Sequence, residues 1–253
     1  RLEYVDRVQL FGLAHRFLVG VDADQQRDDR GRRSVDADGQ VTGLTADEDQ
    51  TATAGGVFVQ TDTDLSDTLT LSLGARADRV RLDIDDDLLA DGDNSGDQDF
   101  TESSYSAGLN WRYQPRHGVY ATVSNAFETP TFTELANPSG AGGFNPDLEP
   151  QKALNREIGG RGQLGDKLFY ELALFRVEVR DEITPYELGG RTFYDNAART
   201  RRDGAELMLE HLTTDTLTLT LAYTYSDYRF ESFYDEQQNE DVGGNRLPGL
   251  PRP

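Results

Sequence analysis

The chain contains no cysteine among its 253 residues. This absence excludes disulfide scaffolds, zinc–thiolate sites and catalysis by a thiol. No run of about 18 or more apolar residues occurs either, so the sequence predicts no transmembrane helix. The opening residues, RLEYVDRVQLF, lack the basic start and apolar middle of a secretion signal. We therefore interpret the sequence as a mature chain or as an internal piece of one.

Basic residues are also scarce. The chain has 46 acidic and 25 basic side chains, a formal net charge of -21, and its only lysines are Lys152 and Lys167. Proteins bind nucleic acid chiefly through lysine and arginine contacts to phosphates. We therefore predict no nucleic-acid partner, and interpret the acidic bias as a feature of a well-hydrated surface.

The apolar residues that are present alternate with polar ones. Only 36% of residues are hydrophobic, which is little for a soluble core in a chain of this length. Leu217, Leu219 and Leu221 fall on one face of a predicted strand, and Thr216, Thr218 and Thr220 on the other. The same alternation occurs at 15–24, 66–78 and 104–113, whereas 167–179 is apolar on both faces. A closed membrane barrel needs only every second residue to be apolar.

The predicted connections between these strands alternate in length. Short ones occur at 10–13, 64–67, 114–118, 164–167 and 211–215. Long ones occur at 25–53, 84–100, 129–151, 184–191 and 231–246. Short turns at one rim and long loops at the other are typical of outer-membrane barrels, whose turns face the periplasm. The sequence therefore predicts an all-β fold: part of an antiparallel up-and-down transmembrane β-barrel, with about ten strands.

A proline-rich stretch separates two of the predicted strands. Thr129-Pro130, Asn145-Pro146 and Glu149-Pro150 interrupt regular pairing and exclude helix, which predicts a long, shaped loop. After the loop, one face of the next strand is predicted to line the lumen and the opposite face to contact lipid. The lumenal residues would be Asn155, Glu157, Gly159, Arg161 and Gln163, opposite Leu154, Ile158 and Leu164.

Several segments, in order and spacing, resemble the C-terminal barrel half of TonB-dependent outer-membrane receptors. They include YSAGLNWRYQPRHGVYATVSNAFETPTFTEL, NPDLEPQKALNREIG, TFYDNAARTRRDGAEL and GNRLPGLPRP, and together they cover nearly the whole chain. The resemblance implies a barrel of about 22 strands with a plugged lumen. Residues 1–253 would all belong to the barrel domain, with the plug domain, the TonB-contacting box and the final strands absent.

The resemblance also implies a function and partners. A receptor of this kind would bind a scarce solute, most often an iron–siderophore complex, at the outer surface of the bacterial outer membrane. A TonB-type protein would then act on the plug to open the lumen, and outer-membrane lipids would surround the barrel. No covalent step is involved, so we predict that the protein is not an enzyme. Cobalamin, oligosaccharides and other metal chelates remain open as substrates.

Five residues on the predicted long loops are candidate ligand contacts. Aromatic and arginine side chains combine a large contact area with fixed hydrogen-bond donors. These residues are Tyr186, Arg191, Phe193, Phe230 and Tyr234.

An acidic stretch, DGDNSGDQDFTE at 91–102, resembles a calcium-binding EF-hand loop in its spacing. Its oxygen-bearing side chains at positions 1, 3, 5, 7, 9 and 12 are Asp91, Asp93, Ser95, Asp97, Asp99 and Glu102. Gly96 falls where such a loop turns sharply, but Gln98 stands where an apolar residue is usual and no flanking helices are predicted. Calcium is therefore a candidate cofactor, and a solvated acidic loop is the alternative.

Catalysis finds no support in the sequence. His15, His117 and His211 belong to no nucleophile or metal-ligand motif. The competing hypothesis from another class is a secreted, calcium-dependent β-rich adhesin or a carbohydrate-binding protein. The chain lacks the short glycine–aspartate repeat that a calcium-binding solenoid would have.

Overall fold

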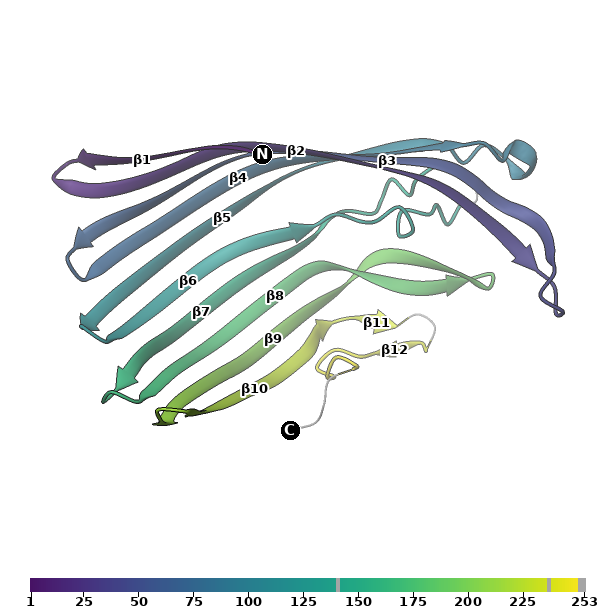
Figure 1. Cartoon of the computed structure of the whole chain (residues 1–253). Coiled ribbons are helices and arrows are strands. Elements are labelled where there is room, and N and C mark those ends of the chain that lie inside the picture. The colour runs from purple at the N-terminus through teal and green to yellow at the C-terminus, as the bar shows by residue number, and fades with distance from the viewer. Residues whose placement is uncertain (140–141, 236–237, 250–253) are drawn as a thin grey trace.

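The structure is a computed structural model, and it describes residues 1–139, 142–235 and 238–249. Ten long strands form one sheet (Figure 1). They are β1 (Leu2–Leu10), β2 (Leu13–Val35), β3 (Val41–Ser66), β4 (Leu69–Asp86), β5 (Gly96–Gln114), β6 (His117–Glu128), β7 (Gln151–Leu164), β8 (Leu168–Leu188), β9 (Arg191–Thr214) and β10 (Leu217–Ser232). A short turn, η1 (Leu89–Asp91), and a small hairpin of β11 (Tyr234–Asp235) and β12 (Glu240–Asp241) complete the elements.

Each of the ten strands pairs antiparallel with the next strand in the chain. Figure 1 shows the sheet curving around a hollow, with β1 and β10 at its two edges, as in part of a barrel. This arrangement confirms the predicted up-and-down fold and its ten strands. In the described part of the chain, no helix combines the length and apolarity needed to cross a membrane.

The register assigns one face of the sheet to lipid and the other to the lumen. Leu221 lies opposite Leu209 on the outward face, whereas Thr220 lies opposite Glu210 on the lumenal face. Leu219 and Leu221 are each 55% exposed, which suits side chains in contact with lipid. The register also orients β8, the strand that is apolar on both faces. Its Leu174 pairs with outward-facing Ile158, so the alternate Phe175 faces the lumen.

The five predicted short connections are all tight turns at one rim of the sheet, as expected. Two of the predicted long loops are wrong. Strands β2 and β3 continue to pair as far as Val35 and Val41, so 25–53 is mostly a β-ribbon closed by a turn at 36–40. Strands β8 and β9 likewise pair as far as Leu188 and Arg191. Gly189 and Gly190 form the intervening turn with positive φ angles of 60° and 78°, which glycine adopts without strain.

The remaining long connections agree better with the prediction. Residues 87–95 link β4 to β5, and 129–150 form a loop between β6 and β7. After β10, Arg246 makes an isolated bridge with Arg229, and the Leu247 amide donates to the Tyr228 carbonyl at 2.9 Å. This bridge lies on the free edge of β10, where the next strand of a barrel would begin.

Strands β5 and β6 separate on the mouth side of Ser106 and Ser124, which are the last residues that pair between them. Asn125 fills the start of the gap. Its Oδ1 accepts a hydrogen bond from the Tyr105 amide at 2.6 Å, and its Nδ2 donates to the Ser103 carbonyl at 2.9 Å. The side chain thereby continues the ladder for one step where backbone pairing has ended.

The 129–150 loop packs into the mouth of the barrel and forms the main apolar core there. Leu135 and Leu148, from the loop, are almost fully buried against Leu82 of β4 and Phe100 of β5. Ile183 and Tyr194 of the β8–β9 ribbon pack around this cluster. The loop therefore joins the β4–β5 side of the mouth to the β8–β9 side.

A side chain on β9 fastens the end of this loop. Asn196 accepts a hydrogen bond from the Glu149 amide at 2.7 Å and donates one to the Glu149 carbonyl at 2.9 Å. Its Nδ2 also donates to the Asp181 carbonyl at 2.7 Å. The side-chain amide of Asn196 thus pairs with the backbone of Glu149 as a neighbouring strand would.

The lipid and lumen faces of β10 can be tested with thiol reagents, because the chain has no cysteine of its own. We expect Leu219→Cys to react with a lipid-soluble maleimide and to resist a membrane-impermeant one. Thr220→Cys should show the opposite preference, measured by mass spectrometry on isolated outer membranes. Equal reactivity of the two variants towards both reagents would contradict the assigned faces.

Leu135→Ala tests the mouth core. Removing a buried leucine side chain typically costs about 2–5 kcal/mol. We expect this loss to appear as faster amide hydrogen exchange in 129–150, with the exchange of the membrane strands unchanged. Leu219→Ala is the matched control, since that leucine faces lipid, and it should leave the loop's exchange rate as it was.

Candidate lumenal site and mouth

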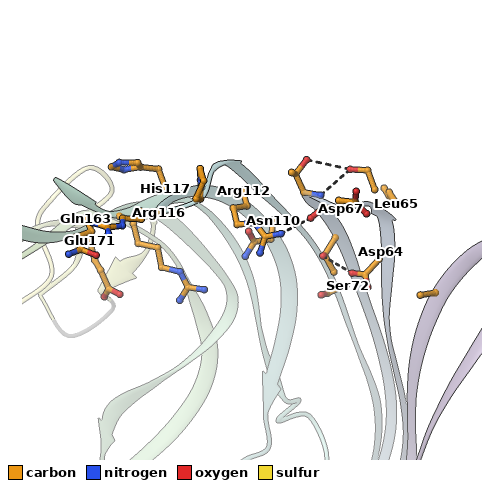
Figure 2. A pocket seen from close by; sticks show the side chains of 18 of the residues that line it. Asp64, Leu65, Asp67, Ser72, Asn110, Arg112, Arg116, His117, Gln163 and Glu171 are labelled. Atoms are coloured by element: carbon orange, nitrogen blue, oxygen red, sulfur yellow. Dashed lines mark hydrogen bonds between the residues drawn. The ribbon is translucent and has the colours of Figure 1, made fainter. Parts of the chain in front are cut away.

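The concave face of the sheet holds a pocket of about 1550 Å³ near the short turns. Its lining comes from strands β1 to β9 and the turns between them, and is mostly polar (Figure 2). Lining side chains include Asp64, Ser72, Asn110, Arg112, Gln163 and Glu171. A wall of carboxylates, amides and arginines suits water or a polar polypeptide rather than an apolar ligand.

Cross-strand hydrogen bonds fix the side chains in this pocket. The Ser72 hydroxyl donates to Asp62 at 2.6 Å, and the Thr70 hydroxyl donates to Asp64 at 2.9 Å. Arg112 donates to the Asp67 carbonyl at 2.6 Å, as Figure 2 shows, and so ties its strand to the neighbouring turn. The pocket therefore has a preset shape.

Nearer the mouth, an arginine bridges two lumenal strands. Arg76 donates two hydrogen bonds of 2.8 Å to Asp22 and further bonds to Asp78. Its guanidinium also lies 5.5 Å from the centre of the Phe58 ring. A Cβ atom on Gly56 would stand 2.2 Å from the Arg76 side chain, so only glycine leaves room for this network.

A second lumenal contact joins β6 to β7. The Tyr120 hydroxyl donates to Glu157 at 2.6 Å. The tyrosine ring lies over Gly159, where a Cβ atom would come within 2.4 Å of it. Glu157 and Gly159 therefore face the lumen, as predicted. Their cross-strand partner could not be identified from the sequence, because partners depend on the register.

Three carboxylates on the lumenal face of β8 and β9 stand apart from these networks. Among the described residues, Glu171, Glu206 and Glu210 have no hydrogen-bond or ion-pair partner. Their acceptor oxygens are available to water or to donors on a molecule inside the lumen.

The predicted ligand residues fall into two groups at the mouth. Tyr186 and Phe193 face each other near the end of the β8–β9 ribbon, with ring centres 6.1 Å apart, and Arg191 lies 5.2 Å above the Phe193 ring. Phe193 is only 4% exposed, so its role here is to support Tyr186 and Arg191. Direct contact between Phe193 and a ligand would require the ribbon to rearrange.

The second group lies at the end of β10 and in the hairpin that follows it. Phe230 stacks on Phe233 with ring centres 5.3 Å apart. Tyr234 is 52% exposed, and its hydroxyl donates to Asn239 at 2.9 Å. Ligand contact by these residues remains a prediction.

The predicted calcium ligands are dispersed. Asp93 lies in the loop before β5 and accepts a hydrogen bond from the Ser95 amide at 2.9 Å. The Ser95 hydroxyl and then its amide hold the pKa of the Asp93 carboxyl below its ordinary value. Asp97 and Asp99 lie within β5 instead of a loop, where Arg81 contacts them at 3.4 and 3.6 Å.

Strand geometry separates the last predicted ligand from the others. Glu102 lies on the opposite face of β5 from Asp97 and Asp99, and pairs with Lys152 at 2.9 Å. The Asp91 side chain lies outside the described part of the structure. Within that part, no group of three or more acidic, histidine or cysteine side chains is arranged to hold a metal ion. Calcium binding here would require Glu102 to leave its strand position, and it remains a prediction.

The family model for the TonB dependent receptor-like β-barrel matches residues 1–252. The chain belongs to this family. Proteins with TonB-dependent receptor barrels lie in the outer membrane of Gram-negative bacteria, which confirms the predicted location.

Individual relatives of this TonB-dependent receptor barrel share about a quarter to a third of the aligned residues with it. An iron-regulated outer membrane virulence protein of Vibrio cholerae is 27% identical over 161 residues, which are 56% of this chain and 24% of that protein. The vitamin B12 transporter BtuB of Vibrio vulnificus is 34% identical over 96 residues, or 37% of this chain and 13% of BtuB. The chain thus spans about a quarter or less of these relatives.

Among solved structures, the siderophore receptor PiuA from Acinetobacter baumannii has a TM-score of 0.74 with this chain at 20% identity. The match covers 98% of this chain and 41% of PiuA. At this identity the likeness shows a shared fold.

Calcium binding by the receptor's acidic loop can be tested by calorimetric titration of the full-length protein. Extracellular calcium sites of this kind bind at roughly 10⁻⁴–10⁻³ M. We expect a binding event in this range that Asp93→Ala with Glu102→Ala abolishes. Lys152→Gln should strengthen it, because Glu102 would lose a competing cation. Absence of binding at millimolar calcium would identify 91–102 as a solvated acidic segment.

Proposed function

We propose that the barrel is part of a receptor that imports a scarce solute across the outer membrane, most favourably an iron–siderophore complex. The observation that carries this proposal is the family match along 1–252, on a sheet whose concave face is polar and roomy. The V. cholerae relative is named as iron-regulated, and PiuA is named as a siderophore receptor. These names support iron as the nutrient concerned.

In this proposal the solute binds at the mouth, and a plug occupies the lumen. A plug polypeptide would offer backbone and side-chain donors to Glu171, Glu206 and Glu210, the lumenal carboxylates that lack partners in the described structure. A TonB-type protein energised from the inner membrane would pull on the plug to open a path. The process consists of binding and gating, with no covalent chemistry.

The rigid mouth core supports binding at this end of the barrel. Because the 129–150 loop is fixed by Leu135, Leu148 and Asn196, it provides a firm wall against the β8–β9 ribbon, which carries Tyr186 and Arg191. A preorganised wall lowers the entropy lost on binding. Acidic loops would repel an anionic chelate in dilute medium, but screening weakens this repulsion at high ionic strength.

Cobalamin is the second candidate substrate, because BtuB of V. vulnificus is named as a vitamin B12 transporter. The family match disfavours the secreted adhesin and carbohydrate-binding alternatives. Uptake assays separate the two nutrients. Cells carrying the full-length protein should accumulate a radiolabelled ferric siderophore and lose this uptake when the TonB-type protein is deleted. Accumulation of labelled cobalamin alone would overturn the iron assignment.

The mouth residues can be tested in the same assay. We expect Arg191→Ala with Tyr234→Ala to raise the half-saturating siderophore concentration by about tenfold, as loss of interface anchors typically does. Tyr113→Ala with Arg116→Ala changes the same residue types at the opposite rim and should leave that concentration unchanged. Both variants are compared at equal surface abundance. An unchanged value in the mouth variant would remove these residues from the binding site.

A further inference from the structure

The outward face of β7 to β10 carries a concentration of arginines just above the apolar band. We call Arg156, Arg176, Arg180, Arg199, Arg201 and Arg229 the basic belt. Strand alternation places all six on the face that carries Ile158, Leu174 and Tyr225. Such a concentration is unexpected in a chain with a net charge of -21.

Within the basic belt, the register places like charges directly opposite each other. Arg156 pairs with Arg176 across β7 and β8. Arg180 lies opposite Lys152, which is outside the belt and contacts Glu102 at 2.9 Å. Arg201 pairs with Arg229 across β9 and β10. Direct cross-strand neighbours have Cβ atoms only about 5 Å apart, and like charges there destabilise a sheet unless an anion lies between them.

The protein's own carboxylates offset only part of this charge. Glu178 pairs with Arg156 at 2.8 Å. Asp203 is shared between Arg176 at 2.6 Å and Arg201 at 3.2 Å. Arg201 also contacts Glu231 at 3.6 Å, and Arg229 contacts Asp227 at 3.1 Å. Four carboxylates therefore serve six arginines, and positive charge is left over.

Two arginines of the belt have no such partner. Arg180 and Arg199 are exposed, and neither makes a hydrogen bond or ion pair with any described residue. Their donors are therefore free to bind a ligand outside the barrel.

The height of the belt in the membrane identifies that ligand. Directly below it, Ile158 and Leu174 are 58% and 51% exposed on the lipid-facing side. The belt lies on the side of the long hairpins, which face the cell exterior in outer-membrane barrels. It therefore stands where the acyl chains of the outer leaflet end and the headgroups begin.

We propose that the basic belt binds the phosphate groups of lipid headgroups in the outer leaflet. The arginine guanidinium offers paired donors that match phosphate oxygens. A phosphate lying between opposed arginines would also relieve their mutual repulsion. The apolar side chains below would hold the acyl chains of the same lipid.

The other half of the sheet provides a matched control. At the same boundary on β4 and β5, Arg79 and Arg81 face Asp83, Asp97 and Asp99. Carboxylates outnumber arginines there, and Asp83 lies directly opposite Asp97. This acidic sector should not attract phosphate.

The test uses the full-length protein in detergent micelles, with fluorescently labelled lipid A as the probe. Lipid A that retains its phosphates should bind, and enzymatically dephosphorylated lipid A should bind much more weakly. Each arginine near a charged lipid surface contributes about a fivefold change in affinity, so Arg180→Gln with Arg199→Gln should weaken binding about 25-fold. Arg79→Gln with Arg81→Gln should change it less than about twofold.

Several results would overturn the proposal. They are equal binding of the two lipid forms, equal losses in the two double variants, and displacement of lipid A by an equal concentration of inorganic phosphate. Because Arg180 and Arg199 are exposed, the variants are expected to fold, which the heat-dependent gel mobility of barrel proteins verifies. Arg156→Gln with Arg176→Gln, within the same belt, should weaken lipid A binding in the same direction.

Discussion

The backbone ladder is the constraint on which the rest of this structure depends. No water is available inside a bilayer, so every amide and carbonyl of a crossing strand must find a partner in its neighbours. Sequential antiparallel pairing meets this requirement for β2 to β9, whereas β1 and β10 each have one edge that the rest of a barrel would pair. Once the register is set, each side chain is assigned to lipid or lumen, and a slip of one residue would exchange the two faces. The polar pocket and the basic belt both follow from that register.

Much of the membrane-embedded part could be predicted from the sequence. The prediction that Leu219 faces lipid and Glu157 faces the lumen requires only a sequence period of two, which the lipid environment imposes. The β2–β3 and β8–β9 ribbons were missed because they extend beyond the apolar band, where no lipid imposes apolar alternation and backbone pairing continues without that signal. Gly189-Gly190 was the available signal, since two glycines suit a two-residue hairpin turn.

The site was less predictable, because its contacts join residues far apart in the chain. Arg76 and Asp22 are 54 positions apart, and their meeting depends on the register of three strands. The calcium pattern illustrates the opposite difficulty. Its spacing is counted along the chain, but the sheet places Asp99 and Glu102 on opposite faces of β5, where arginine and lysine partners compete for them.

The separation of β5 from β6 allows such a receptor to diversify at its mouth. Below Ser106 and Ser124 the two strands share a ladder, and an insertion there would shift the register of the wall. Above them the ladder has ended, and the 129–150 segment enters at that seam. Residues can therefore be added or lost in this segment while the membrane wall stays the same. The end of the β5–β6 ladder therefore separates the loop residues that evolution can vary for new nutrients from the strand residues that the bilayer holds constant.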